Sequence, residues 1–151
     1  MTDAADGALA LAQALVTADG QLATRMGISF LEVRPGRLVA TMPVEGNRQP
    51  YGLLHGGASA VLAETMGSIA AQLHAGGDRM SIGVDLNCTH LRAARDGLVT
   101  GVCTPLHEGR RVATYQIEIF DADGEQVCVA RLTCQLIKRG TLRAPAVEQP
   151  A

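Results

Sequence analysis

The stretch from Gly56 to Leu73 constrains the fold of this chain more than any other part of the sequence. It has one charged residue, Glu64, contains no proline and few β-branched residues, and is apolar nearly all round. A helix of this composition must bury most of its surface. Extended from about Gly57 to Ala75, it would be on the order of 27 Å long. We therefore expect one long helix in the middle of the fold, and the central glutamate makes a membrane span a poor alternative.

Strand-forming runs lie on both sides of this helix. Ile28 to Arg34 and Arg37 to Pro43 flank a Pro35-Gly36 pair, which favours a tight hairpin. Four further runs follow the helix, with short polar connections that predict hairpins in a meander: Met80–Leu91, Leu98–Leu106, Arg111–Phe120 and Gln126–Ile137. Alternating apolar residues in the last two runs predict one dry sheet face. Together the elements predict an α+β fold in which an antiparallel β-sheet wraps around one long central helix.

The chain has 151 residues, the size of one domain. We expect an N-terminal helical segment over residues 1–26, the main domain over residues 27–138 and a flexible tail over residues 139–151. A single helix covers only part of such a sheet. Association through the sheet edge or the open face, with closed two-fold symmetry, is therefore expected.

Composition argues against several classes of function. A formal net charge of −2 and an aromatic content of 3% do not favour a nucleic-acid or anionic-membrane partner. The cysteines form no C-x-x-C pair and the histidines no H-E-x-x-H motif, so no metal site is expected. Asp3 and Asp6 stand where a secretory signal would carry positive charge, which predicts a cytoplasmic protein.

Glu64 is the residue whose position most needs an explanation. Burying an ionised carboxylate without a partner costs several kcal/mol or forces its pKa upward. Two structural alternatives carry as much weight on general grounds as a functional role: a helix face that reaches solvent, and a structural hydrogen bond made by the carboxylate. Ser68, four residues further on, shares the same helix face, and small neighbours leave room for a ligand. A pocket with a carboxylate at its floor fits this pattern.

A polar, glycine-rich segment precedes the helix and ends in Gly56-Gly57. Backbone N–H groups exposed at such a helix start can hold a developing oxyanion. The alternatives are glycines that only permit a turn and a His55 that only caps the helix. Gln49, His55, the free N–H donors, Glu64 and Ser68 together nevertheless suit acyl transfer to water.

The leaving group can be narrowed by chemistry. The sequence has no G-x-S-x-G elbow and no obvious acid–base pair to protonate an amine or alkoxide. A thiol has a pKa of about 8.5, so a thiolate leaves with little help. One carboxylate and an oxyanion hole can therefore cleave a thioester.

Several stretches of the sequence resemble the hotdog-fold acyl-CoA thioesterases of the PaaI-like superfamily, from about Gly27 to Ile137. The stretches are Gly52-Leu53-Leu54-His55-Gly56-Gly57-Ala58, Ala63-Glu64-Thr65-Met66-Gly67-Ser68, Asn87-Cys88-Thr89-His90-Leu91-Arg92, Gly101 to Arg110, and Ile117-Glu118-Ile119-Phe120-Asp121. The chain looks most similar to the branch with the enterobactin proofreading, the 1,4-dihydroxy-2-naphthoyl-CoA and the Arthrobacter-type 4-hydroxybenzoyl-CoA thioesterases. This resemblance implies hydrolysis of an acyl-CoA, with aryl or aroyl groups favoured.

The resemblance also implies roles for single residues. Glu64 would be the catalytic carboxylate, acting as nucleophile or as general base, and the Gly56 N–H would polarise the thioester carbonyl. Gln49 and His55 would assist around the carbonyl and the leaving sulfur, and Ser68 would position water or Glu64. The site would be shared across a dimer interface, with the acid from one protomer and the glycine-bearing loop from the other, in a homotetramer built as a dimer of dimers.

Coenzyme A would enter as part of the substrate, with no further cofactor. By resemblance its contacts would be Gly83, His90, Arg92, His107, Gly109 and Arg110. Arginine suits phosphate, although loop arginines are usually only solvated. An acyl carrier protein is an alternative carrier. An enoyl-thioester hydratase and a non-catalytic acyl-CoA-binding oligomer are the alternative functions.

Overall fold

The computed structural model describes residues 7–10, 12–14 and 22–141. Residues 7–10 and 12–14 are helical, and the other elements follow in the order α2 (Leu22–Arg25), β1 (Ser29–Arg34), β2 (Arg37–Pro43), α3 (Gly56–Ala75), β3 (Arg79–His90), β4 (Leu98–Glu108), β5 (Val112–Phe120) and β6 (Gln126–Lys138). The remainder of the expected N-terminal helical segment, and residues 142–151 of the expected tail, lie outside the described residues. The division into residues 1–26, 27–138 and 139–151 stays a prediction.

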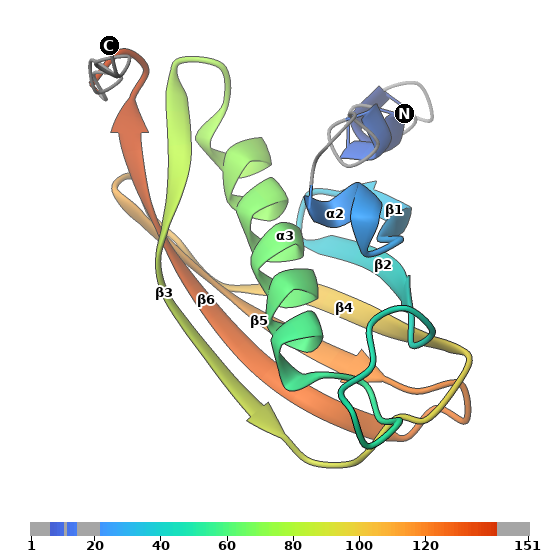
Figure 1. The fold of residues 1–151 in the computed structure, drawn as a ribbon. Coiled ribbons are helices and arrows are strands. Elements are labelled where there is room, and N and C mark those ends of the chain that lie inside the picture. The colour runs from blue at the N-terminus through green and yellow to red at the C-terminus, as the bar shows by residue number, and fades with distance from the viewer. Residues whose placement is uncertain (1–6, 11, 15–21, 142–151) are drawn as a thin grey trace, which may run out of the picture.

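The six strands form one antiparallel sheet in the order β1-β2-β4-β5-β6-β3. The long helix α3 lies against the concave face of this sheet (Figure 1). The expected α+β fold, an antiparallel sheet around one long helix, is confirmed. The β1–β2 hairpin turns at Pro35-Gly36, and Gly36 has a φ of 81° there, which only glycine adopts without strain.

One part of the predicted topology is wrong. β3 and β4 do not form a hairpin, because β3 pairs with β6 from Arg79↔Lys138 to His90↔Cys128, while β4 lies between β2 and β5. The helix crosses the face of the sheet and delivers β3 to the edge opposite β1 (Figure 1). The segment after β3 therefore has to cross back before β4 can pair with β2. Only β4, β5 and β6 form the expected meander.

The packing of α3 places its functional face. The side chains of Leu62, Ala63 and Met66 are fully buried against the sheet. Glycines bring the helix close, since a Cβ atom at Gly67 would lie 2.5 Å from Leu132 and one at Gly101 would lie 2.5 Å from the Met66 sulfur. The expected dry face of β5 and β6 packs on this helix and is buried: Ala113, Tyr115, Ile117, Ile119, Cys128, Ala130, Leu132, Cys134 and Leu136.

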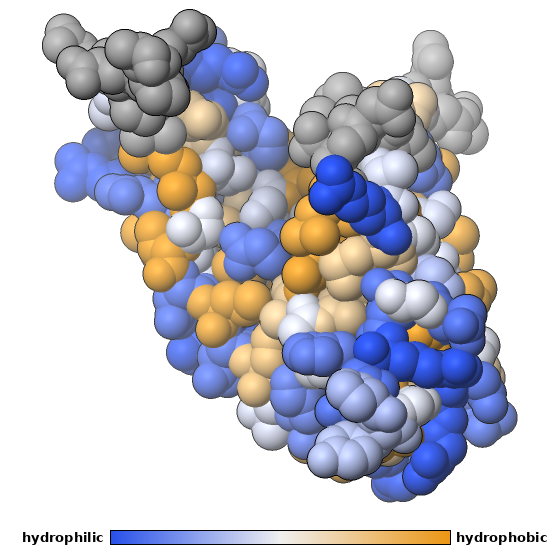
Figure 2. Space-filling model, viewed as in Figure 1, coloured by the Kyte–Doolittle hydropathy of each residue, from blue (hydrophilic) through white to orange (hydrophobic). Residues whose placement is uncertain are grey.

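β3 is an edge strand and differs from the rest of the sheet. None of its residues is fully buried, and Val84 is 58% exposed. Apolar side chains gather over this part of the molecule in Figure 2. Its outer edge pairs with no strand among the described residues. The strand facing α3 therefore has a free edge and partly exposed apolar residues.

Candidate functional site

The start of α3 is capped by a histidine. His55 has extended backbone angles (φ −68°, ψ 131°), and its Nδ1 accepts a hydrogen bond from the Gly57 N–H at 2.8 Å. Because Nδ1 is the acceptor, the neutral ring carries its proton on Nε2. Within the described chain, nothing accepts from that Nε2–H. His55 therefore does cap the helix, as the structural alternative expected, and its Nε2–H remains available as a donor.

Gly56 is the first residue of α3, and its N–H finds no acceptor in the described part of the chain. The N–H groups of Ala58 and Ser59 are paired, because both donate to the His55 carbonyl, at 2.8 and 3.4 Å. The ring of His90 lies against Gly56, where a Cβ atom would be 2.8 Å from His90 Nε2. A side chain at position 56 would therefore crowd the ring of His90.

A cavity of about 420 Å³ opens beside this helix start. It brings together four of the residues predicted from the sequence: Gln49, Gly56, His90 and Arg92. The preceding loop is held in place by the Asn47 amide, which donates to the carbonyls of Met26 and Pro43 at 2.9 and 2.8 Å. An amide, an unpaired N–H, an imidazole and a guanidinium thus line one polar hollow.

Glu64 does not line this cavity. It lies eight residues after Gly56 on the same helix, which corresponds to about 12 Å along the helix axis. Its side chain is half-buried, and its carboxylate lies against β3 at Gly83. Within one chain, Glu64 and the Gly56 N–H therefore lie about two helix turns apart.

The surroundings of Glu64 favour its protonated form. Burial raises the pKa of its carboxyl, and a hydrogen bond with the Ser68 side chain partly opposes that rise. Two thiols lie close enough for the glutamate charge to affect them. Burial, with a contribution from Glu64, raises the pKa of Cys134 to about 11, and it also raises the pKa of Cys88. No cation forms an ion pair with Glu64 among the described residues.

The residues expected to contact coenzyme A fall into three groups. Gly83 lies beside Glu64, and His90 and Arg92 lie at the 420 Å³ cavity, where Arg92 pairs with Glu125 at 3.3 Å. His107, Gly109 and Arg110 lie near the opposite end of β3, beyond Arg79. One chain therefore does not gather all of the expected contacts in one place.

Arg110 belongs to a cationic hollow of about 580 Å³, which we call the basic bowl. Its charged lining consists of five cations and one acid: Arg79, Arg110, Arg111, Lys138, Arg139 and Asp78. Arg79 and Arg139 donate to the backbone carbonyls of Arg110 and Gly77, and none of the five cations forms an ion pair among the described residues. Of these cations only Arg110 was expected at the coenzyme A site, because the pairing of β3 with β6 brings Arg79 and Lys138 together from distant parts of the chain.

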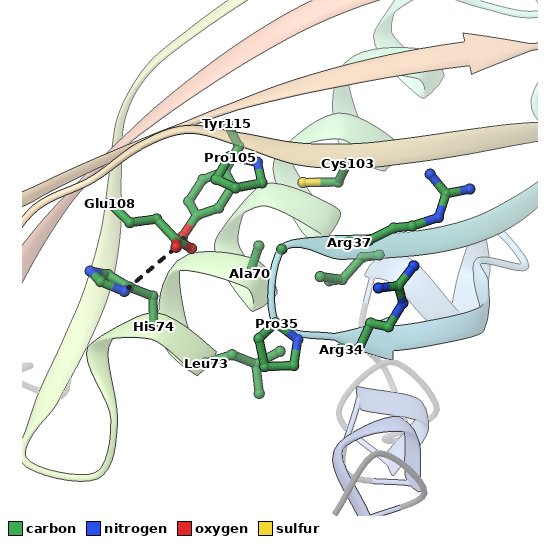
Figure 3. Close-up of a pocket in the computed structure, with 12 residues that line it drawn as sticks. Arg34, Pro35, Arg37, Ala70, Leu73, His74, Cys103, Pro105, Glu108 and Tyr115 are labelled. Carbon is green, nitrogen blue, oxygen red and sulfur yellow. Dashed lines mark hydrogen bonds and ion pairs between the residues drawn. The ribbon is translucent and has the colours of Figure 1, made fainter. Parts of the chain in front are cut away.

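A polar cluster that the sequence analysis missed lies at the other end of α3 (Figure 3). The Tyr115 hydroxyl donates to Glu108 Oε1 at 2.8 Å, His74 Nδ1 lies 3.9 Å from Glu108 Oε2, and His74 Nε2 lies 3.0 Å from the Gly109 carbonyl. The tyrosine is almost fully buried and borders a cavity of about 100 Å³. A signal existed, because a tyrosine on a dry sheet face needs a partner for its hydroxyl. The groups of this cluster satisfy one another.

Two further features are absent from the described residues: a metal-binding cluster and a membrane-spanning helix. No three histidine, cysteine or acidic side chains converge there as a metal site would require. No helix in that part of the chain is long and apolar enough to cross a membrane.

Known proteins similar to this chain include thioesterases. The model of the thioesterase superfamily matches residues 51–128. A 1,4-dihydroxy-2-naphthoyl-CoA hydrolase of Escherichia coli is 46% identical over 120 residues, which cover 79% of this chain and 88% of that protein. The proofreading thioesterase EntH of Cronobacter turicensis is 43% identical over 118 residues, covering 78% and 86%.

Solved structures agree with these sequence matches. A thioesterase from Haemophilus influenzae superimposes with a TM-score of 0.81 at 37% identity, covering 86% of this chain and 90% of that one. A thioesterase from Pseudomonas aeruginosa gives 0.78 at 35% identity, covering 86% and 94%. The resemblance inferred from the sequence is confirmed, and the chain belongs to the thioesterase superfamily, with the hotdog fold.

Proposed function

We propose that the protein hydrolyses aryl or aroyl thioesters of coenzyme A to the free acid and the thiol. The observation that carries this proposal is Glu64, a half-buried carboxylate with a raised pKa and no ion-pair partner among the described residues. A carboxylate in such surroundings is suited to act as a base near neutral pH. The name of the Escherichia coli relative supports an aryl-CoA substrate, as does the likeness to the PaaI-like branch.

The active site is completed by a second copy of the chain. Glu64 and the Gly56 N–H are about 12 Å apart along one helix, so the two groups that act on one carbonyl come from different protomers. The free edge of β3 and its exposed Val84 provide a surface for the partner. A homotetramer, built as a dimer of dimers, follows from the same resemblance.

The groups of the two protomers divide the chemistry. The Gly56 N–H donates to the thioester oxygen and stabilises the negative charge that develops there, and the His55 Nε2–H and the Gln49 amide assist. Glu64 either removes a proton from the attacking water or attacks the carbonyl carbon itself. In the first case a C–O bond forms, the C–S bond breaks, and the proton held by Glu64 leaves with the thiolate as free thiol. In the second case a bond forms between a Glu64 oxygen and the carbonyl carbon as the C–S bond breaks. Water then cleaves the resulting anhydride into the free acid and the Glu64 carboxylate, and its proton goes to the thiolate. Ser68 orients the glutamate through their hydrogen bond.

The phosphates of coenzyme A bind to cations at the surface. His90 and Arg92 serve one part of the substrate at the 420 Å³ cavity, and His107, Gly109 and Arg110 serve the nucleotide beside the basic bowl. The five cations of the basic bowl face a single acid, so a bound phosphate would stabilise them by reducing their mutual repulsion. An acyl carrier protein presents the same phosphopantetheine arm, so it is the alternative carrier. We include a cytoplasmic location in the proposal.

The test is release of free thiol from a panel of benzoyl, hydroxybenzoyl, phenylacetyl, naphthoyl and fatty acyl-CoA, each also offered on a carrier protein. We expect an aryl-CoA to be the best substrate. Glu64→Gln should lower kcat by about 10²–10⁴, with KM little changed. Glu118→Gln is the matched control, because Glu118 is a half-buried glutamate on β5 that accepts from Gln126 at 3.0 Å.

Full activity in Glu64→Gln would overturn the proposal. Water addition to an enoyl thioester without thiol release would assign a hydratase instead. Binding of acyl-CoA with no turnover of any thioester would assign a non-catalytic binding protein.

A further inference from the structure

The carboxylate of Glu64 lies in a notch in β3 that exists only because residue 83 is glycine. A Cβ atom built on Gly83 would lie 2.2 Å from Glu64 Oε1, and its three nearest neighbours would all be atoms of the glutamate carboxyl group. Real Cβ contacts do not occur at such a distance. The glutamate therefore fills the space that a side chain at position 83 would need.

Backbone conformation does not explain the glycine. Gly83 has no positive φ, so any residue could adopt its backbone angles. The strand is irregular directly after it, because the pairing of β3 with β6 shifts register between Gly83 and Asp85. What residue 83 lacks is volume, and the three atoms nearest to the missing volume all belong to the Glu64 carboxyl.

The strand at this point is tied to the helix and cannot move away easily. Gln72 on α3 accepts from the Ser81 N–H and donates to the Arg79 carbonyl, both at 3.1 Å. The Ser81 hydroxyl donates to the Ser68 carbonyl at 3.1 Å. These bonds fix β3 against α3 two residues before Gly83. A methyl group added at position 83 would therefore displace the flexible glutamate rather than the strand.

We propose that Gly83 is a positioning residue of the reaction, whose missing side chain lets the Glu64 carboxylate seat against β3. With Ser68 bonding from the helix side, the notch fixes where the carboxylate stands relative to the thioester. This role rests on the proposed function of Glu64. It differs from the role that the resemblance implies, in which Gly83 contacts coenzyme A, and the two roles predict different kinetics.

The first experiment is Gly83→Ala in the full chain. A displaced carboxylate should lower kcat by about 10- to 100-fold, because a misplacement of about 1 Å can cost that much, while KM should change by less than about 2-fold. The displaced carboxylate is also less buried, so its pKa falls and the acid limb of the kcat profile should move to lower pH. A glycine that only contacts coenzyme A would instead change KM and leave the pH profile in place.

The second experiment couples the two positions. Glu64→Asp withdraws the carboxylate by one methylene, so it should cost less kcat in the Gly83→Ala background than in the wild type, a non-additive double-mutant cycle. A stability cycle does not depend on activity. Gly83→Ala should lower the melting temperature in the wild type and have a smaller effect in Glu64→Ala, where the carboxylate is gone. Should Gly83→Ala alone fail to fold, the Glu64→Ala/Gly83→Ala protein should recover folding.

Gly101→Ala is the matched control. Its Cβ would lie 2.5 Å from the Met66 sulfur, so it crowds the same helix–sheet interface from β4 without approaching Glu64. It should lower the melting temperature, leave the pH profile unchanged and show no coupling with Glu64→Asp.

The outcomes separate this inference from the proposed function. Full activity of Glu64→Gln would overturn the proposed function itself. An inactive Glu64→Gln together with additive cycles, or with a Gly83→Ala protein that changes only KM, would overturn the role of Gly83 alone. The role would also be overturned if Gly83→Ala lowered the melting temperature as much in the Glu64→Ala background as in the wild type.

Discussion

The two ends of α3 each carry a histidine and a glycine, and they differ in how many polar groups the chain satisfies. At the C-terminal end, His74 Nε2 contacts the Gly109 carbonyl, and the Gly76 N–H donates to the Gln72 carbonyl at 3.2 Å. At the N-terminal end, His55 uses one ring nitrogen as a cap, and the Gly56 N–H finds no acceptor among the described residues. The same residue types thus serve structure at one end and leave donors available at the other.

The difference has a physical basis in the helix itself. A helix leaves N–H groups unpaired at its start and carbonyl groups unpaired at its end, and its dipole favours negative charge at the start. An anion that develops during acyl transfer is therefore stabilised only at the Gly56 end. His55 and His74 are the same residue type, and what distinguishes them is whether the neighbouring polar groups have hydrogen-bond partners.

The largest difference in activity between the two ends is expected when the glycine at each end is replaced by alanine. Gly56→Ala places a Cβ atom 2.8 Å from His90 Nε2, which disturbs the proposed oxyanion donor, and kcat for thiol release should fall by about 10²–10³. Gly76→Ala meets no atom but has a φ of 74°, so it should cost about 1 kcal/mol of stability. Its kcat should stay within about 2-fold. Equal losses of activity in the two variants would refute the distinction between the ends.

Removing the two histidines tests the same contrast with a smaller effect. His55→Ala loses the helix cap, worth about 1 kcal/mol, and the Nε2–H donor, so kcat should fall by roughly 10-fold. His74→Ala removes a side chain that contacts Gly109 and Glu108, and thiol release should be unchanged when measured below its melting temperature. If His74→Ala lost as much kcat as His55→Ala, the C-terminal cluster would belong to the catalytic machinery.

The hydrogen bond between Ser68 and Glu64 can be tested through the pH dependence of activity. That bond lowers the pKa of Glu64 against the larger effect of burial, so Ser68→Ala should raise the pKa. A base works only when deprotonated, and the acid limb of kcat/KM should therefore move to higher pH, with the loss of activity confined to the acid side of the profile. Ser68→Thr keeps the hydroxyl and should retain the wild-type profile. An unshifted limb in Ser68→Ala would show that Glu64 is not the group that titrates.

The sequence predicted the local elements well. The long helix was expected from about Gly57 and begins at Gly56, because a run without proline and with one charge has few other solutions. The Pro35-Gly36 hairpin was readable because a glycine at positive φ is a local signal. The partner of β3 was not readable, since its pairing with β6 joins residues some forty or more positions apart, and such contacts are set by the packing of the whole sheet.

The candidate site was predictable in its residue types and not in its distances. Glu64 stands out because charge is rare in an apolar helix, and Gly56 because it begins that helix. Their separation, and the approach of Glu64 to Gly83, depend on where β3 lies against α3. Similarly, Tyr115 and Glu108 meet only because β4 changes register against β5 between Pro105 and His107. The contact between Glu108 and Tyr115 could therefore not be predicted from their spacing in the sequence.

The smallest expected effect on activity comes from that tyrosine. Burial and the neighbouring Glu108 charge raise the pKa of Tyr115, so its hydroxyl stays protonated and donates to Glu108 throughout the working pH range. Tyr115→Phe keeps the ring in the core and removes one hydrogen bond, which should lower the free energy of unfolding by about 1 kcal/mol in urea. Thiol release should be unchanged, because His74 of this cluster lies nearly three turns beyond Glu64 on α3. A loss of kcat as large as that of His55→Ala would mean that the satisfied end of the helix takes part in the reaction after all.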